Sequence, residues 1–112
     1  MREYKPYVPK TIGELVDLLG SMMLHSPTFT DDSGYFPGMS IDSTFLELNE
    51  SLKLLRPKLG EDSYLALEEL SDRMRAHFEA DPEDKTEDSL KGRDCILEME
   101  EILKASARRK PG

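Results

Sequence analysis

The chain has 112 residues, with 23 aspartates and glutamates against 15 lysines and arginines, and its formal net charge is −8. A chain of this length can bury one hydrophobic core, so we expect a single domain. Its acidic balance disfavours nucleic acids and anionic membranes as partners, because both attract proteins chiefly through lysine and arginine.

The cysteine content and the apolar runs point to the cytoplasm. Cys95 is the one cysteine, which excludes an intramolecular disulfide and gives no sign of an oxidising compartment. No apolar run approaches membrane-spanning length, and no apolar signal region follows Met1. We therefore expect a cytoplasmic protein that does not enter a membrane.

The N-terminal part predicts an extended segment followed by a helix. Residues 1–10 contain Pro6 and Pro9, which favour an extended lead-in. Thr11 and Glu14 have the spacing of a capping box, so a helix is expected to begin there. Apolar residues then recur every three or four positions from Ile12 to Met23, the pattern of one buried helical face.

A long loop is expected between the first two helices. The segment 26–40 holds two prolines, two glycines and three aromatic residues, and its fifteen residues are many for a connection inside a small bundle. Loops of this length are often functional, so it is the first candidate for a binding element.

The middle of the chain predicts two further helices. One begins between Ser40 and Ser43 and is expected to lose its regular form near Leu55, because Pro57 lacks an N–H and clashes with the preceding turn. Gly60 is expected to complete the turn. The next helix runs from about Glu61 to Ala80 and is stopped by Pro82; its inward row is Tyr64, Leu67, Ser71, Met74 and Phe78.

The C-terminal part predicts a fourth helix. An acidic segment, Asp81 to Lys85, leads to Thr86 as the cap, and an apolar face extends from Gly92 to Leu103. The fold class is therefore all-α: a single-domain antiparallel bundle of about four helices with a long loop between the first two. The bundle domain occupies residues 11–103, between the extended segment 1–10 and a basic tail, 104–112.

Charge is distributed unevenly in the first half of the chain. Residues 11–52 include seven acids and no lysine or arginine. Such a gap predicts an exposed acidic surface that docks on a basic partner, with acids steering the encounter and aromatic rings anchoring the complex. Glu14 and Asp17 are possible neighbours of this surface. The predicted partner-binding residues are Asp31, Asp32, Tyr35, Phe36, Asp42, Glu47 and Glu50.

An alternative stays open for the aromatic residues of the loop. Three aromatic side chains in a small protein without tryptophan are also expected to contribute to its core. They could turn inward and close one end of the bundle while the acids around them are simply solvated.

Enzymatic and metal-binding readings are disfavoured. His25, His77 and Cys95 are far apart and have structural explanations, so we predict no catalytic residue, metal site or cofactor. The acidic stretch 81–88 lacks the glycine of a calcium loop and has Lys85 at a ligand position.

One enzymatic pattern is the alternative. Glu47-x-x-Glu50 followed by Glu69-x-x-Asp72 resembles the paired acids with which all-α nucleoside triphosphate pyrophosphohydrolases hold Mg²⁺. Helical phase places both pairs away from the apolar rows, however, which favours a non-enzyme.

Several short stretches carry a family resemblance that covers about residues 11–103. They are Ser26-Pro27-Thr28-Phe29, Gly34-Tyr35-Phe36-Pro37, Leu55-Arg56, Leu59-Gly60-Glu61, Tyr64, Ser71-Asp72-x-Met74-Arg75, Phe78-Glu79-Ala80-Asp81-Pro82 and Glu98-Met99-Glu100. Together they resemble small bacterial immunity proteins of contact-dependent growth inhibition and related polymorphic toxin systems.

The resemblance implies a non-catalytic antitoxin that binds the C-terminal toxin domain of a large exported protein and covers its active site or substrate groove. Many such toxins are nucleases, whose basic groove suits an acidic inhibitor. Two features depart from the simplest picture. A second acidic cluster competes as the docking face; its residues are Asp81, Glu83, Asp84, Glu87 and Asp88. Three basic residues lie close in sequence to the first acidic stretch, 11–52; they are Lys53, Arg56 and Lys58.

The first prediction concerns Asp31 and Asp32. Reversing both to lysine should slow association with the cognate toxin domain, because two steering acids become repulsive. Stopped-flow association at low salt measures the effect, and an unchanged on-rate would remove the pair from the interface.

Overall fold

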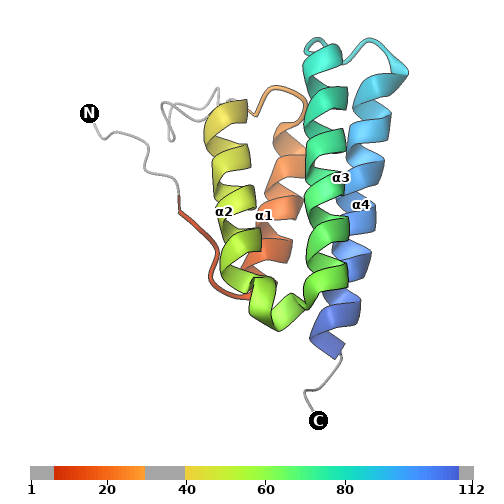
Figure 1. Ribbon diagram of the computed structural model, residues 1–112. Helices are drawn as coiled ribbons and strands as arrows, with labels where there is room; N and C mark the ends of the chain where they lie inside the picture. Colours follow the sequence, from red (N-terminus) through yellow and green to blue (C-terminus); the bar gives the residue numbers. More distant parts are fainter. Residues whose placement is uncertain (1–6, 30–39, 109–112) are drawn as a thin grey trace, which may run out of the picture.

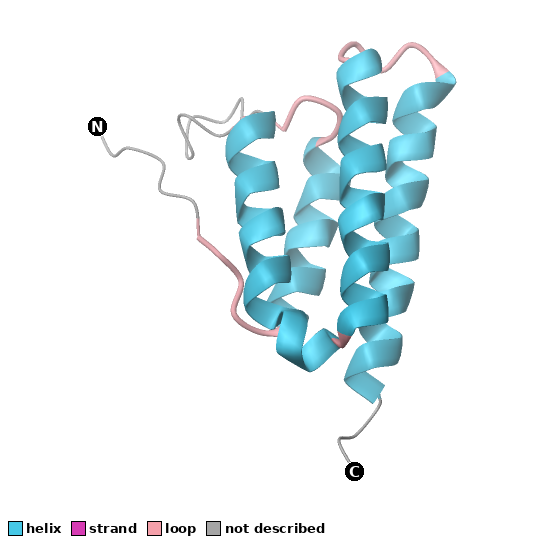
Figure 2. Cartoon of the chain, viewed as in Figure 1, coloured by secondary structure: helices cyan, strands magenta, loops and turns pink. Residues whose placement is uncertain are grey.

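The computed structural model describes residues 7–29 and 40–108. They form four helices: α1 (Ile12–His25), α2 (Ile41–Leu59), α3 (Glu61–Ala80) and α4 (Glu87–Arg108). Successive helices run in opposite directions, and α1 and α3 each pack against both α2 and α4 (Figure 1). The described ranges contain helix and loop but no strand (Figure 2). The predicted all-α antiparallel bundle is confirmed.

Helix boundaries follow the capping residues. The Thr11 hydroxyl accepts a hydrogen bond from the Glu14 N–H at 3.0 Å, while the Glu14 carboxylate accepts from Lys10 N–H at 3.0 Å rather than from Thr11. Ser40 and Ser43 form a reciprocal cap at the start of α2. These contacts satisfy N–H groups that have no partner within their own helix.

Two predicted helix ends are wrong. α2 does not stop near Leu55 but continues through Pro57 to Leu59. Pro57 lies in the last turn, where it removes a single helical hydrogen bond, and Leu59 is buried, so packing outweighs the loss. α4 likewise runs past Leu103 to Arg108, because Ser106 still packs inward. The first five residues of the predicted tail are therefore helical.

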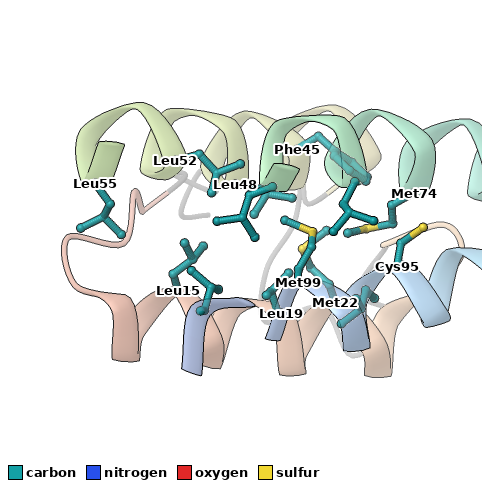
Figure 3. Packing of buried hydrophobic residues seen from close by; sticks show 14 of the residues in the cluster. Leu15, Leu19, Met22, Phe45, Leu48, Leu52, Leu55, Met74, Cys95 and Met99 are labelled. Carbon is teal, nitrogen blue, oxygen red and sulfur yellow. The ribbon is translucent and has the colours of Figure 1, made fainter. Parts of the chain in front are cut away.

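No helix in residues 7–29 and 40–108 is both long enough and apolar enough to cross a membrane. The apolar residues instead form one core between the helices, made mainly of leucine and methionine (Figure 3). Leu15, Leu19 and Met22 enter it from α1, and Leu48 and Leu52 from α2. Exclusion of these side chains from water is the main force that holds the bundle together.

Three aromatic rings join the helices at one end of the core. Phe29 follows α1, and its ring meets those of Phe45 in α2 and Phe78 in α3 edge to face, with centroids 5.7 Å and 5.2 Å apart. Phe29 has a left-handed φ of 60°, an unfavourable backbone state for a large side chain. Burial of its ring offsets that cost. Of the two alternatives for the loop aromatic residues, Phe29 therefore follows the one in which the ring turns into the core.

Gly92 of α4 completes this junction. A Cβ atom at Gly92 would lie 2.5 Å from Cε1 of Phe78, so only glycine lets α4 approach the ring this closely. Gly20 of α1 is the contrast: a Cβ atom there would have no neighbour within 4 Å. The two glycines therefore predict opposite effects of alanine.

The second prediction compares Gly92→Ala with Gly20→Ala. The Gly92 variant should lose about 1–3 kcal/mol of unfolding free energy, because an overpacked Phe78 must shift against Phe29. The Gly20 variant should gain about 0.5–1 kcal/mol, because alanine restricts the unfolded chain and favours helix. Urea unfolding followed by circular dichroism measures both. Equal stabilisation by the two substitutions would show that the backbone of Gly92 does not lie as close to the Phe78 ring as described.

Candidate functional site

Four of the predicted partner-binding residues, Asp31, Asp32, Tyr35 and Phe36, lie outside the described residues. Of the other three, Asp42 and Glu50 are exposed on α2, as expected for a docking surface. Glu47 is not.

Glu47 is only 6 % exposed, and the prediction that it lies on the open acidic surface is wrong. Ser51, one turn further along the same side of α2, donates a hydrogen bond to the Pro9 carbonyl at 2.8 Å. The N-terminal segment therefore lies against this side of α2. The periodicity of apolar residues shows only which side of a helix faces the core. It therefore did not reveal that a second side of α2 is also buried.

The acids of residues 11–52 do not form one continuous surface within the described ranges. Glu14 lies at the start of α1, where its carboxylate accepts hydrogen bonds from Lys10 N–H and from the Tyr7 hydroxyl at 2.9 Å. These two bonds, with the Lys10 contact the larger cause, lower the pKa of Glu14. Glu14 is thus committed to the N-terminal cap, whereas Asp42 lies at the opposite end of the bundle.

A different acidic surface is formed by the exposed side of α2 and α3. We call it the acidic face; it consists of Asp42, Leu46, Glu50, Lys53, Leu65, Glu68, Glu69, Asp72 and Glu79. It therefore carries six carboxylates and one lysine, and the partly exposed Arg75 of α3 lies among them, paired with Asp42 and Glu79. Two exposed leucines lie among them, one on each helix.

Contacts between α2 and α3 fix the register of this face. The Ser71 hydroxyl donates to the Asn49 side-chain oxygen at 2.7 Å, which brings Glu50 and Asp72, the next residue on each helix, to the same level. Arg56 and Glu61 form an ion pair beside the Gly60 turn, with Nε of Arg56 2.7 Å from Oε1 of Glu61. Asp42 and Arg75 form a second ion pair at the far end.

Two of the basic residues near the face, Arg75 and Lys53, are engaged within the chain, whereas Arg73, which follows Asp72 on α3, is exposed and forms no ion pair within the described residues. Arg75 pairs with Asp42 and with Glu79, the latter at 3.4 Å, and Lys53 pairs with Glu50 at 3.2 Å. Within the described residues, Glu69 and Asp72 form no ion pair. Both carboxylates lie on the exposed side of α3, next to the exposed Arg73, and are open to an external cation.

The second acidic cluster is largely occupied by internal contacts. Asp84 pairs with Arg93 at 2.8 Å, and Asp88 lies 3.0 Å from His77 Nδ1. Glu83 pairs with Lys85 at 2.8 Å. This cluster therefore organises the connection between α3 and α4 and is the weaker candidate for a docking surface.

Asp81 is the centre of that connection. It is buried, and its carboxylate accepts from the N–H groups of Lys85 at 2.8 Å, Thr86 at 2.9 Å and Ser89 at 3.3 Å. Burial alone would raise the pKa of Asp81, but the hydrogen bonds from Lys85 and Thr86 outweigh it and hold this pKa far below its usual range. Its ionised form fixes the start of α4.

The four acids of the pyrophosphohydrolase alternative do not converge. Glu47 is buried on the side of α2 that faces the N-terminal segment, whereas Glu50, Glu69 and Asp72 are exposed. Across residues 7–29 and 40–108, no three histidine, cysteine, aspartate or glutamate side chains are grouped so that they could hold a metal ion. The spacing that resembled a metal motif instead forms part of the acidic face.

Cys95, His25 and His77 have structural surroundings. Cys95 is buried in α4, and this burial raises the pKa of its thiol, which keeps it protonated. His25 Nδ1 lies 2.9 Å from the Ser21 carbonyl in the last turn of α1.

The exposed acids of α3 are not among the predicted partner-binding residues, although their spacing is visible in the sequence. Asp62, Leu65, Glu69 and Asp72 recur every three or four residues, which places them on one exposed helical stripe.

Comparison of the chain with protein-family models, with curated proteins and with solved structures gives no match.

The third prediction concerns the pH dependence of stability. Because the folded pKa of Asp81 is lowered, its stabilising contribution is complete above the unfolded pKa of about 3.9 and is lost as pH falls below that value. Asp81→Asn should lower the urea midpoint at pH 7 and flatten the loss of stability on acidification below about pH 4.

Glu83→Gln is the matched control for Asp81→Asn. It removes one carboxylate from the same connection. The Asp81 carboxylate oxygens, which accept the hydrogen bonds from the backbone N–H groups, stay in place. The midpoint of the Glu83 variant at pH 7 should stay close to that of the unmodified chain. Equal acid sensitivity of the Asp81 variant and the unmodified chain would contradict the assigned role.

Proposed function

We propose that this chain is an immunity protein that binds a cognate toxin domain in the bacterial cytoplasm and neutralises it without catalysis. The proposed partner is the C-terminal domain of an exported toxin with a basic active site or substrate groove, such as a nuclease. The acidic face on α2 and α3 would cover that groove.

The single observation that carries the proposal is the pair of exposed carboxylates on α3, Glu69 and Asp72, which form no ion pair within the described residues. In water such charges are stabilised by solvent, and they attract a basic surface over several ångströms. A nuclease groove presents lysine and arginine to bind phosphate, so its potential is complementary to this face.

Leu46 and Leu65 supply the second part of the proposed interaction. Both are about half exposed, and each is flanked by acids of its own helix. Exposed apolar side chains that become buried in a complex stabilise it by roughly 25 cal/mol for each Å² removed from water. In the proposed complex the acids increase the rate of encounter, and the leucines slow dissociation.

Rigid support for the face favours inhibition by coverage. The short Gly60 connection and the three contacts between α2 and α3 hold the face in one shape before binding. A preorganised surface loses little conformational entropy when it binds, which increases affinity for a groove of matching shape.

The fourth prediction reverses both central acids. Glu69→Lys together with Asp72→Lys should lower the on-rate for the cognate toxin domain at least about tenfold at low salt. The difference should shrink near 0.5 M salt, where screening shortens the Debye length to about 4 Å. Surface plasmon resonance at several salt concentrations measures it.

Glu83→Lys together with Glu98→Lys is the control with the same change in net charge. These two residues are exposed on the loop after α3 and on α4, away from the acidic face. Their reversal should reduce the on-rate much less. Equal effects of the two double variants would show that net charge acts without a defined docking face.

A further inference from the structure

The N-terminal segment lies on the helical bundle as a strap. We use this name for residues 7–10, which run beside α2 and then lead into α1 (Figure 1). Ser51 of α2 is fully buried, and its hydroxyl donates to the carbonyl of Pro9 at 2.8 Å. Pro9 is buried as well. This contact, between residues far apart in the sequence, places the strap directly on the Ser51 side of α2.

Side chains of the bundle hold the strap at two points. One is the Ser51 hydroxyl. The other is the Glu14 carboxylate, which accepts hydrogen bonds from the Lys10 N–H at 3.0 Å and from the Tyr7 hydroxyl at 2.9 Å. Within the described residues, no backbone–backbone hydrogen bond joins residues 7–10 to the rest of the chain. The strap is therefore attached more weakly than the helices, whose backbone groups bond one another.

The strap also buries little apolar surface. Tyr7 is 54 % exposed, Lys10 is exposed and Val8 is half-buried, so Pro9 is the one buried residue of the four. A segment with few buried apolar contacts and few backbone hydrogen bonds opens at a much lower free energy than the core. Detachment of the strap should therefore not require unfolding of the helices.

The start of α1 is secured without the strap. The Thr11 hydroxyl accepts from the Glu14 N–H, and the Thr11 carbonyl accepts from the Leu15 N–H at 3.0 Å. Neither contact uses an atom of residues 7–10. The backbone between Lys10 and Thr11 can therefore act as a hinge, because α1 stays capped when the strap moves.

We propose that residues 7–10 open and close as one unit on the folded bundle, with the Glu14 carboxylate as the main anchor. Opening gives access to the side of α2 on which Glu47 and Ser51 are buried. In the open state water supplies hydrogen bonds to the Ser51 hydroxyl and to the Pro9 carbonyl, which limits the cost of detachment. The strap thus regulates access to this side of α2, and the inference does not depend on the proposed toxin partner.

The test measures amide hydrogen exchange by NMR on the ¹⁵N-labelled full chain. The Lys10 amide reports the closed strap, because its N–H is bonded to Glu14. The amides of Leu19 and Leu52, both in the core, report global unfolding. The Lys10 amide should exchange more slowly than in an unstructured peptide but at least about 100-fold faster than the core amides. Low urea should accelerate exchange in the core and leave Lys10 nearly unchanged, because opening of the strap exposes little surface.

Tyr7→Phe and Ser51→Ala each remove a strap contact that does not involve the Lys10 N–H. If the strap moves as a unit, each substitution should accelerate exchange of the Lys10 amide by about two- to tenfold, the effect of one lost hydrogen bond. Ser71→Ala is the matched control for Ser51→Ala, since it removes a buried hydroxyl that donates to Asn49 instead of the strap. It should leave exchange of the Lys10 amide unchanged.

Four results would each overturn the inference. Exchange of Lys10 at the rate of the core amides would mean that the strap leaves only when the bundle unfolds, and exchange at the unprotected rate would mean that it is not closed. Unchanged Lys10 exchange in either folded variant, or an equal increase in Ser71→Ala, would mean that the contacts do not act together. Tyr7→Phe alters an exposed side chain, so it keeps the test decisive even if Ser51→Ala fails to fold.

Discussion

The contact between Phe29, Phe45, Phe78 and Gly92 brings all four helices to one point. Each residue comes from, or directly follows, a different helix, and the bare backbone of Gly92 lets α4 close on the Phe78 ring. The left-handed backbone conformation at Phe29 costs free energy, and burial of the Phe29 ring in the core offsets that cost. This junction fixes how α2 and α3 lie side by side, and so it also fixes the surface that their outer residues form.

The electrostatic organisation follows from that arrangement. Acids near the helix connections are used internally: Asp81 holds the start of α4, Glu14 caps α1, and Asp84 binds Arg93. In the middle of α3, Glu68 accepts a hydrogen bond from the Tyr64 hydroxyl at 2.8 Å, whereas Glu69 and Asp72 form no ion pair within the described residues. Internal ion pairs engage Arg75 and Lys53, while Arg73 stays exposed beside Asp72, and the acidic face still has more carboxylates than bases. The proposed antitoxin activity depends on that surplus.

Sequence reasoning succeeded where local chemistry decides the structure. Thr11, Ser40 and Gly60 mark helix boundaries because capping and left-handed φ are properties of single residues. It failed where tertiary contacts decide: burial of Leu59 carries α2 through Pro57, and Glu47 is buried on a side of α2 where Ser51 donates a hydrogen bond to the Pro9 carbonyl. The acidic face was only partly predictable, since Asp42 and Glu50 were identified but their partners on α3 depend on the register between helices.

The central claim is that this chain protects a bacterium from a toxin by binding it. The most direct measurement is growth of bacteria that express the proposed cognate toxin domain, with and without this chain. The account predicts that growth stops with the toxin domain alone and is restored by co-expression, in proportion to complex recovered from the cells. Continued growth arrest despite abundant folded protein would contradict it.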